Sequence, residues 1–503
     1  MTALIRKIIP IIGLVLIFAA VFAAYFPSLR HVARGDQVNY MAEVAHLTTW
    51  KELAIDTFDL SRRGKFNSGD VLMFRPGFYF FLGNEYYFFK YNFFWCQLIA
   101  ILMHLFSVTA LFLLLRRMGA GVFALIPTLF FALLFSNYEG VVWYHIVSIV
   151  SFTAFILMAL ERLLRYAQGG ASAAGALWAA VALTGAALMV NEVALWCAIC
   201  FFFYASQVKN VSRPWLRASV FCFIAAGYAV WNVFNFVSNG VVLSGEAAKI
   251  GHPDILHTFK NVVWLFKVFF AGGFFLHPDS VIPVSRLMVS QNFFHWAWPV
   301  EGWKNIYWPG ALAGVLLVTG LFLSRRDPKN VSWRPMVILI ASALWGYLFF
   351  LVIGRVNTRG TSGEGLASAL YYHYSFWAFL VAGISAWGVN RIFPKWVLGV
   401  MLAVVFAFSV YNAMNIYALA QRMANDHKAS RVLFQTLDKV VREHKNEPDF
   451  SFGVTPDVPG NYFVSWLEKK GDPPGKRYTL VELMYPKYYN VIHPKYVIKP
   501  MMK

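Results

Sequence analysis

The chain has 503 residues, of which 59% are hydrophobic and only 14% charged, and its mean hydropathy is +0.54. Soluble domains are roughly half apolar and a quarter charged, so this composition excludes an ordinary soluble enzyme and indicates an integral membrane protein. The formal net charge of +19 would favour nucleic acid as a partner of a soluble protein, but here the basic residues gather in connectors between apolar runs and indicate membrane topology.

Apolar runs predict about eleven membrane-spanning helices, most of them near the ~20 residues that the hydrocarbon core of a bilayer requires. They lie near residues 8–26, 93–115, 119–137, 141–160, 173–190, 193–208, 217–237, 306–323, 335–354, 374–390 and 396–418. A further apolar run, 259–276, is interrupted by lysines and a Gly-Gly pair, and we expect it to form a re-entrant or interfacial helix.

Basic residues in alternate connectors predict the orientation. If the amino terminus is cytoplasmic, all of these connectors fall on the cytoplasmic side, as the positive-inside rule requires. The predicted external loops are therefore 27–92, 239–305 and 355–373. The connectors carry Arg6-Lys7, Arg116-Arg117, Arg162 with Arg165, Lys209 with Arg213 and Arg217, Arg325-Arg326 with Lys329 and Arg334, and Arg391 with Lys395.

Charged residues, proline and glycine return after Gln421. We expect residues 1–420 to form the membrane domain and residues 421–503 a small external α+β domain. The apolar content of this tail suffices only for a marginal core, so the tail is expected to dock on the membrane domain. All four cysteines lie inside apolar segments, and we predict neither a disulfide nor a thiol-bound metal.

Apart from His104, the ionisable residues outside the basic connectors gather at the external ends of spans or in external loops. Inserting an ionisable side chain at membrane depth costs about 2.5–3.5 kcal/mol, so such a side chain normally faces a cavity and has a function. The pattern indicates a site that opens outward. Its candidates are Asp36, Glu43, Asp70, Arg75, Glu139, His145, Glu192, Arg355, Arg359, Glu364 and His373.

Three acids are open to two interpretations each. Asp36, directly after the first span, is a general-base candidate or a helix N-cap. Glu139, in the connection between the third and fourth spans, shares a helical face with Trp143 or is a solvated turn acid. Glu192 has apolar residues on both sides, which favours a functional or paired acid over one without a role.

The connector 354–365 contains glycines and two arginines, and Tyr372 and His373 follow it. Arginine matches phosphate oxygens and keeps its charge, so this segment is a candidate phosphate cradle. Alternatively, Arg355 and Arg359 anchor the adjacent spans in lipid headgroups.

Four stretches resemble, in order, motifs of the GT-C integral-membrane glycosyltransferases, with the closest likeness to the protein O-mannosyltransferase branch. That branch includes the transmembrane tetratricopeptide mannosyltransferases and their bacterial relatives. The chain departs from the family in lacking these repeats, in having Asn191 where a basic residue is usual, and in having Gly35-Asp36-Gln37 instead of paired acids. The stretches are Phe74–Tyr79, Ile101–Arg117, Tyr138–Trp143 and Asn191–Leu195, and the likeness covers roughly residues 10–210.

The resemblance implies an inverting glycosyltransferase that moves a monosaccharide from a polyprenyl-phosphate donor to a hydroxyl of a glycan, lipid or protein. The reaction would take place on the periplasmic or outer face of a bacterial inner membrane. Mapped onto matching positions, Asp36 would be the general base. Arg75 and Glu139 would line the donor and acceptor cavity, and Glu192 would orient the sugar.

From the residues themselves we add Arg355, Arg359 and His373 as groups that stabilise the departing lipid phosphate. Trp143, His145 and Tyr372 are expected to line the sugar and acceptor site. No cluster of acids or histidines demands a metal, so a requirement for a divalent cation is left open. The expected partners are the lipid-linked donor, its acceptor and membrane lipids, without nucleic acid.

Three alternatives compete with this interpretation. An O-antigen-ligase-like transferase would use a lipid diphosphate-linked glycan and residues of the long external loop, such as His252, His257, His277 and Arg286. A lipid-linked-sugar transporter or flippase would place ionisable residues near the bilayer midplane. A non-catalytic assembly protein on the same scaffold is the third. Because P-loop and dinucleotide-binding motifs are absent from the sequence, a nucleotide-driven enzyme is disfavoured.

Overall fold

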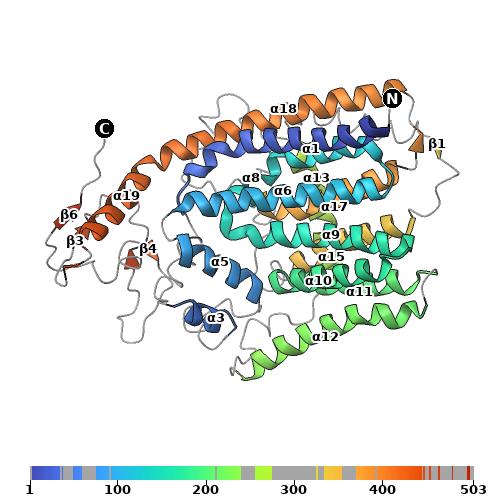
Figure 1. The fold of residues 1–503 in the computed structure, drawn as a ribbon, viewed down its shortest axis with the longest axis horizontal. Coiled ribbons are helices and arrows are strands. Elements are labelled where there is room, and N and C mark those ends of the chain that lie inside the picture. The colour runs from blue at the N-terminus through green and yellow to red at the C-terminus, as the bar shows by residue number, and fades with distance from the viewer. Residues whose placement is uncertain are drawn as a thin grey trace. The chain divides into compact units, whose positions relative to one another are not determined.

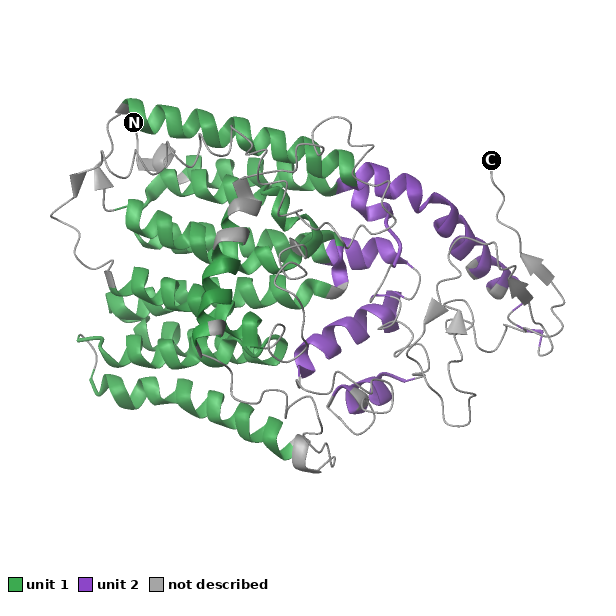
Figure 2. Cartoon of the chain, turned by 180° about the vertical axis from the view of Figure 1, so that it is seen from behind, with its two compact units in different colours: residues 1–25, 100–142, 146–419 green, residues 26–99, 143–145, 420–503 purple. Residues whose placement is uncertain are grey.

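The structure is a computed structural model of the whole chain. It describes residues 3–33, 37, 49–58, 75–89, 92–209, 212–238, 255–274, 325–326, 334–353, 370–389, 391–392, 395–444, 446–447 and four short strands within 452–498. The chain divides into two compact units (Figure 2). Unit 1 contains residues 1–25, 100–142 and 146–419, and unit 2 contains residues 26–99, 143–145 and 420–503.

Unit 1 is built from apolar helices that run side by side (Figure 1). Strands β1 (Arg325–Arg326) and β2 (Arg391–Ile392) pair antiparallel in this unit. The first turns of α6 and the last turns of α18 belong to unit 2. The helices are α1 (Ala3–Tyr25), α6 (Phe93–Arg117), α7 (Leu125–Ala132), α8 (Tyr138–Val142), α9 (Val147–Gln168), α10 (Ala173–Val190), α11 (Ala194–Ser206), α12 (Pro214–Ser238), α13 (Ile255–Phe274), α15 (Arg334–Leu351), α17 (His373–Gly388) and α18 (Lys395–Asp426).

Within the described residues, six helices are long and apolar enough to cross a membrane, which makes this a multi-pass membrane protein. They overlap the predicted spans that begin near residues 8, 93, 141, 173, 217 and 396, although the helix in the third of these starts only at Val147. Helices α11 and α15 are apolar but shorter. The predicted span 306–323 lies outside the described residues, so the count of eleven stays a prediction. The interrupted run near 259–276 does form a helix, α13.

One predicted span is broken. The sequence predicts a continuous helix over 119–137, whereas α7 ends at Ala132 and, after a break, the 3₁₀ helix η3 (Phe135–Asn137) leads into the short helix α8. The helical segments on the two sides of the break are bent by 59°. Because a helix end exposes unsatisfied backbone groups, such a break inside an apolar bundle needs substitute hydrogen-bond partners.

Side chains supply the partners of the two carbonyls before the break. The His104 Nε2 atom lies 2.9 Å from the Ala132 carbonyl oxygen, and Asn137 Nδ2 donates to the Phe131 carbonyl at 2.7 Å. A carbonyl can only accept, so Nε2 carries the proton, and Nδ1 of the neutral ring accepts from the Tyr374 hydroxyl at 2.7 Å. His104 therefore connects α6, the end of α7 and α17.

Helix α18 supplies the partner of the backbone amide after the break. The Phe135 N–H donates to Asn412 Oδ1 at 3.2 Å, and Asn412 Nδ2 donates to the carbonyl of Phe408 at 2.8 Å. Asn412 is buried, so its amide is held between its own helix and the break. The broken span is thus stabilised by polar side chains of two other helices, α6 and α18, and by its own Asn137.

A buried ion-pair cluster joins α6 and α9. Glu161 lies on α9 and is almost fully buried, and its carboxylate contacts Arg117 at 3.0 Å and Arg162 at 3.3 Å. Both arginines belong to the connectors that the sequence assigns to the cytoplasmic side. Opposite charges compensate the desolvation of the carboxylate, so here the basic residues have a packing role in addition to a topological one.

Unit 2 contains the 3₁₀ helix η1 (Phe26–Arg30), α3 (Trp50–Phe58), α5 (Pro76–Phe89) and α19 (Lys428–Glu443). Proline at the first position of α5 suits a helix start, since that backbone nitrogen has no intrahelical partner. Strands β3 (Phe452–Val454) and β6 (Tyr496–Ile498) pair parallel, and β4 (Phe463–Val464) and β5 (Tyr478–Thr479) antiparallel. A separate α+β domain over 421–503 stays a prediction, because most of residues 445–503 lie outside the described part.

Helices α11 and α15 pack closely at a glycine. A Cβ atom added at Gly346 of α15 would overlap the indole of Trp196, whose Nε1 donates to the Ser342 carbonyl at 2.8 Å. We predict that Gly346→Ala lowers the free energy of unfolding by about 1–3 kcal/mol, since the rigid indole must move. Thermal unfolding in detergent measures the change.

Gly185→Ala is the matched control for this prediction. Gly185 lies on α10, and no atom of the described residues is within 4 Å of an added Cβ there. Alanine is the better helix former, so this variant should be as stable as the wild type or more stable by up to about 1 kcal/mol. An unchanged melting temperature for Gly346→Ala would contradict the close packing of α11 on α15.

Candidate functional site

Within unit 1, helix α8 lies against the 3₁₀ helix η10 (Leu370–Tyr372) and the start of α17. The approach is closest at Gly140, where an added Cβ would lie 3.1 Å from the Tyr374 ring. Glu139 precedes Gly140 and His373 precedes Tyr374, so a candidate acid and a candidate imidazole lie on adjoining elements. The structure therefore brings the sequence-predicted residues Glu139, Tyr372 and His373 together in one region.

All three of these side chains are buried. Glu139 is 3% exposed, and His373 is fully buried with its ring centroid 4.2 Å from that of Phe269 on α13. The Tyr372 carbonyl accepts a hydrogen bond from the Tyr347 hydroxyl at 2.8 Å. Buried polar side chains held in place by close packing are typical of a preorganised site.

Aromatic stacking fixes the position of α8. The ring of Tyr138 stacks on Tyr25 of α1, with centroids 6.3 Å apart, and on Phe135, with centroids 6.0 Å apart. Tyr25 in turn meets the His104 ring edge-on at 5.8 Å. The groups that satisfy the break after α7 therefore also hold the helix that carries Glu139.

The predicted shared face of Glu139 and Trp143 is not formed. Helix α8 ends at Val142, and Trp143 lies in the bend that follows it. The four-residue spacing of Glu139 and Trp143 therefore does not place these two side chains on one helical face. Trp143 itself is buried and belongs to unit 2, together with Tyr144 and His145.

Glu192 lies in the turn between α10 and α11 and is half-buried. Its carbonyl accepts from the Leu195 N–H at 3.0 Å, and the Asn191 side chain accepts from the Val193 N–H at 3.0 Å. Asn191 stands where the resembling family has a basic residue, and here its amide closes the turn. Asparagine is suited to this geometry because its short side chain bonds the backbone two residues on.

Arg75 directly precedes α5 in unit 2. It is half-buried, and its carbonyl accepts from the Tyr79 N–H at 3.2 Å in the first turn of the helix. Asp36, Arg355 and Arg359 lie outside the described residues, as does the His145 side chain. Their roles stay predictions.

Sequence reasoning missed Glu85, a buried acid on α5. It is 3% exposed, and neither carboxylate oxygen has a hydrogen-bond partner among the described residues. Glu85 interacts electrostatically with both Tyr144 and Cys96, so these three residues lie in one buried region of unit 2. The Tyr86 and Tyr144 rings also meet there, with centroids 6.0 Å apart.

Burial raises the pKa of Glu85 well above its ordinary value. Burial and the adjacent Tyr86 likewise raise the pKa of the Tyr144 hydroxyl. A glutamate inside the aromatic run 78–89 is the signal that could have identified this region. Among the described residues, no group of three or more His, Cys, Asp or Glu side chains is placed to hold a metal ion.

No known protein-family model matches the chain, and no curated protein matches it by sequence. Among solved structures it is similar to ArnT from Cupriavidus metallidurans bound to undecaprenyl phosphate, at 14% identity and a TM-score of 0.43, over 98% of this chain and 86% of that one. It is also similar to the Archaeoglobus fulgidus oligosaccharyltransferase in complex with zinc and sulfate, at 14% identity and a TM-score of 0.44, over 88% of this chain and 59% of that one.

The raised pKa of Glu85 predicts a stability that depends on pH. A carboxyl that stays protonated when folded but ionises when unfolded contributes stability that is complete below the unfolded pKa, about 4.3. This contribution is lost as pH rises toward the folded pKa, at about 1.4 kcal/mol per pH unit for one proton. The substitution Glu85→Gln removes this pH-dependent contribution to stability.

We therefore expect Glu85→Gln to match the wild type near pH 4.5 and to exceed its stability increasingly toward pH 7. Thermal unfolding in detergent across this range measures the difference. Glu443→Gln, which removes an exposed carboxylate from α19 of the same unit, is the control for loss of a charge. If the unfolding temperatures of Glu85→Gln and the wild type changed with pH in parallel, the Glu85 carboxyl would be hydrated and not buried.

Proposed function

We propose that the protein is an inverting glycosyltransferase that takes a monosaccharide from a polyprenyl-phosphate donor and transfers it to an acceptor hydroxyl on the outer face of the membrane. The observation that carries the proposal is the packing of α8 on η10 and α17, which gathers Glu139, Tyr372 and His373 in a buried region of a multi-pass membrane protein. Acids and imidazoles are rare among buried membrane residues unless they have a function.

The donor phosphate is assigned to the connector that leads into this region. In the sequence, Arg355 and Arg359 lie between α15 and η10, and His373 follows η10 directly. Negative charge grows on the phosphate as its bond to the sugar breaks, so cations there stabilise the transition state more than the ground state. A lipid-linked donor needs no nucleotide pocket, in agreement with the missing nucleotide-binding motifs.

The reaction is a single displacement. The acceptor oxygen bonds to the anomeric carbon, the bond from that carbon to the phosphate oxygen breaks, and the lipid phosphate leaves with the electron pair. Asp36 takes the proton of the acceptor hydroxyl. Attack from the face opposite the leaving group inverts the anomeric configuration. Glu139 and Tyr372 contact the sugar or the acceptor, Glu192 orients the sugar, and Arg75 binds the donor.

Glu139 provides the first test. We predict that Glu139→Gln lowers the rate of transfer roughly 10-fold to 100-fold, because a preorganised contact to the sugar is lost. The assay measures release of polyprenyl phosphate by mass spectrometry from a panel of polyprenyl-phosphate sugars. Glu161→Gln, which alters another buried acid of unit 1 within the ion-pair cluster of α6 and α9, should retain transfer once the amount of folded enzyme is equalised.

Asp36 provides the second test. As the general base, its replacement by asparagine should reduce the rate by about 10²–10⁴ while donor binding is retained. The same assay with a lipid diphosphate-linked donor distinguishes a ligase-like transferase, which would consume that donor and be insensitive to Asp36→Asn. Wild-type turnover of the polyprenyl-phosphate donor by Asp36→Asn would remove this residue from the mechanism.

A further inference from the structure

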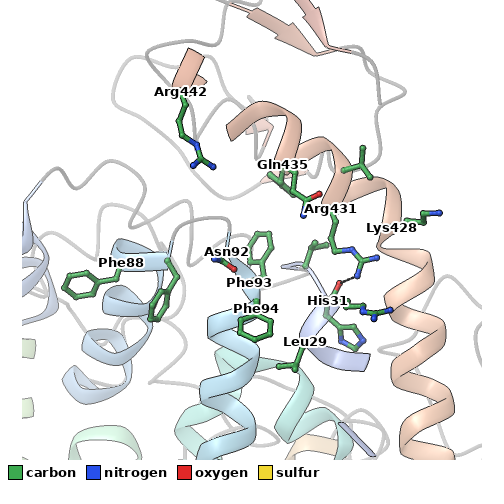
Figure 3. A pocket seen from close by; sticks show the side chains of 15 residues that line it. Leu29, His31, Phe88, Asn92, Phe93, Phe94, Lys428, Arg431, Gln435 and Arg442 are labelled. Atoms are coloured by element: carbon green, nitrogen blue, oxygen red, sulfur yellow. Dashed lines mark hydrogen bonds between the residues drawn. The ribbon is translucent and has the colours of Figure 1, made fainter. Parts of the chain in front are cut away.

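Unit 2 contains a cavity with cationic and aromatic lining residues. Its volume is about 880 Å³, and it is lined by the end of η1, by the turn from α5 into α6 and by α19 (Figure 3). None of its lining residues belongs to the proposed catalytic set. The lining residues that bear on its chemistry are Arg30, Phe88, Phe94, Lys428, Arg431 and Arg442.

The cavity is strongly cationic. Four of its lining residues are arginine or lysine, and none of the described lining residues is acidic. Lys428 and Arg431 are three residues apart on α19 and therefore neighbours on its surface. They lie in its first turn, where the positive end of the helix dipole also favours an anion. Arg442 lies about three turns further along the helix.

Two of the cations are held close together. The Arg431 Nη1 atom donates to the backbone carbonyl of Arg30 at 3.0 Å, which Figure 3 marks as a dashed line. Burial and the nearby Arg30 charge lower the pKa of Arg431, so the two guanidinium groups repel each other. An anion between them would relieve this repulsion and satisfy their donors.

Hydrogen bonds to two histidines also fix the walls. His31 Nε2 lies 2.9 Å from the Ala420 carbonyl oxygen, and the Val32 N–H donates to His427 Nδ1 at 3.2 Å. These bonds connect the segment after η1 with the end of α18 and the start of α19. The cationic groups are therefore presented by a preformed wall, which reduces the entropy cost of binding a ligand.

Aromatic side chains give the cavity an apolar side. Phe93 and Phe434 meet edge-on at 5.6 Å and are buried, whereas Phe88 is 62% and Phe94 is 42% exposed. Arg30 and Phe93 are terminal residues of two candidate membrane spans. The cavity is thus lined by residues at the ends of membrane helices, where a molecule with both a charged and an apolar part is stable.

We propose that this cavity binds the phosphate group of an amphiphile, with the phosphate on Arg30, Lys428 and Arg431 and the apolar chain along Phe88 and Phe94. Guanidinium and ammonium groups without an acid favour phosphate over an uncharged headgroup, and the exposed rings favour a lipid-borne phosphate over a free one. The site is independent of the proposed transfer reaction, because it shares no residue with it.

The test measures binding to the full-length protein in detergent. Three probes are compared by thermal shift and native mass spectrometry: phosphatidylglycerol, a diacylglycerol with the same acyl chains, and inorganic phosphate. We expect phosphatidylglycerol to bind and the diacylglycerol not to bind. Lys428→Gln should weaken phosphatidylglycerol binding about tenfold, as loss of one charge-assisted contact implies.

Lys439→Gln is the matched control. It removes the same charge from the same helix, but Lys439 pairs with Glu443 and does not line the cavity. The Lys439→Gln variant should bind phosphatidylglycerol with the same affinity as the wild type. Binding of inorganic phosphate that depends on Lys428 would assign the site to a free anion and overturn the lipid source, whereas equal affinities of both lysine variants for every probe would overturn the site itself.

Discussion

The hydrogen bonds at the break between α7 and α8 are the interactions on which the candidate site depends. A helix that ends inside an apolar bundle leaves carbonyl and amide groups that neither water nor lipid can satisfy. Here His104 and Asn137 bond the last carbonyls of α7, and Asn412 bonds the first free amide beyond it. With these partners the chain can turn by 59° and carry Glu139 to η10 and α17 instead of continuing as one span.

The buried ionisable groups of unit 1 and unit 2 have different surroundings. In unit 1, Glu161 is neutralised by arginines of α6 and α9, and His104 makes two hydrogen bonds. In unit 2, burial raises the pKa of Glu85, while Arg431 lies close to a second cation without an acid lining the cavity. The first arrangement favours a rigid scaffold, and the second is typical of regions that exchange protons or bind ions.

The hydropathy pattern predicted most of the described long helices, because an apolar run of about 20 residues has few other stable conformations in a bilayer. It could not predict the break directly after α7, since residues 125–135 are almost entirely apolar and the partners of the break on α6 and α18 are distant in sequence. For the same reason Glu139 was identified as a candidate but was paired with Trp143 on a helical face that does not form. Glu85 was missed because residues 27–92 were interpreted as an external loop without a buried core. The cationic cavity was missed because its lining residues come from both ends of the chain.

The distance in sequence between Phe135 and Asn412 has a consequence for biogenesis. The two residues are 277 positions apart, and Asn412 lies on α18, which follows every other described helix of unit 1 along the chain. During synthesis on the ribosome, the hydrogen bond from the Phe135 amide to Asn412 can therefore form only after nearly the whole membrane part has been translated. A nascent or truncated chain that ends before α18 therefore contains Glu139 but lacks the hydrogen bond that satisfies the amide of Phe135 beside it in the chain.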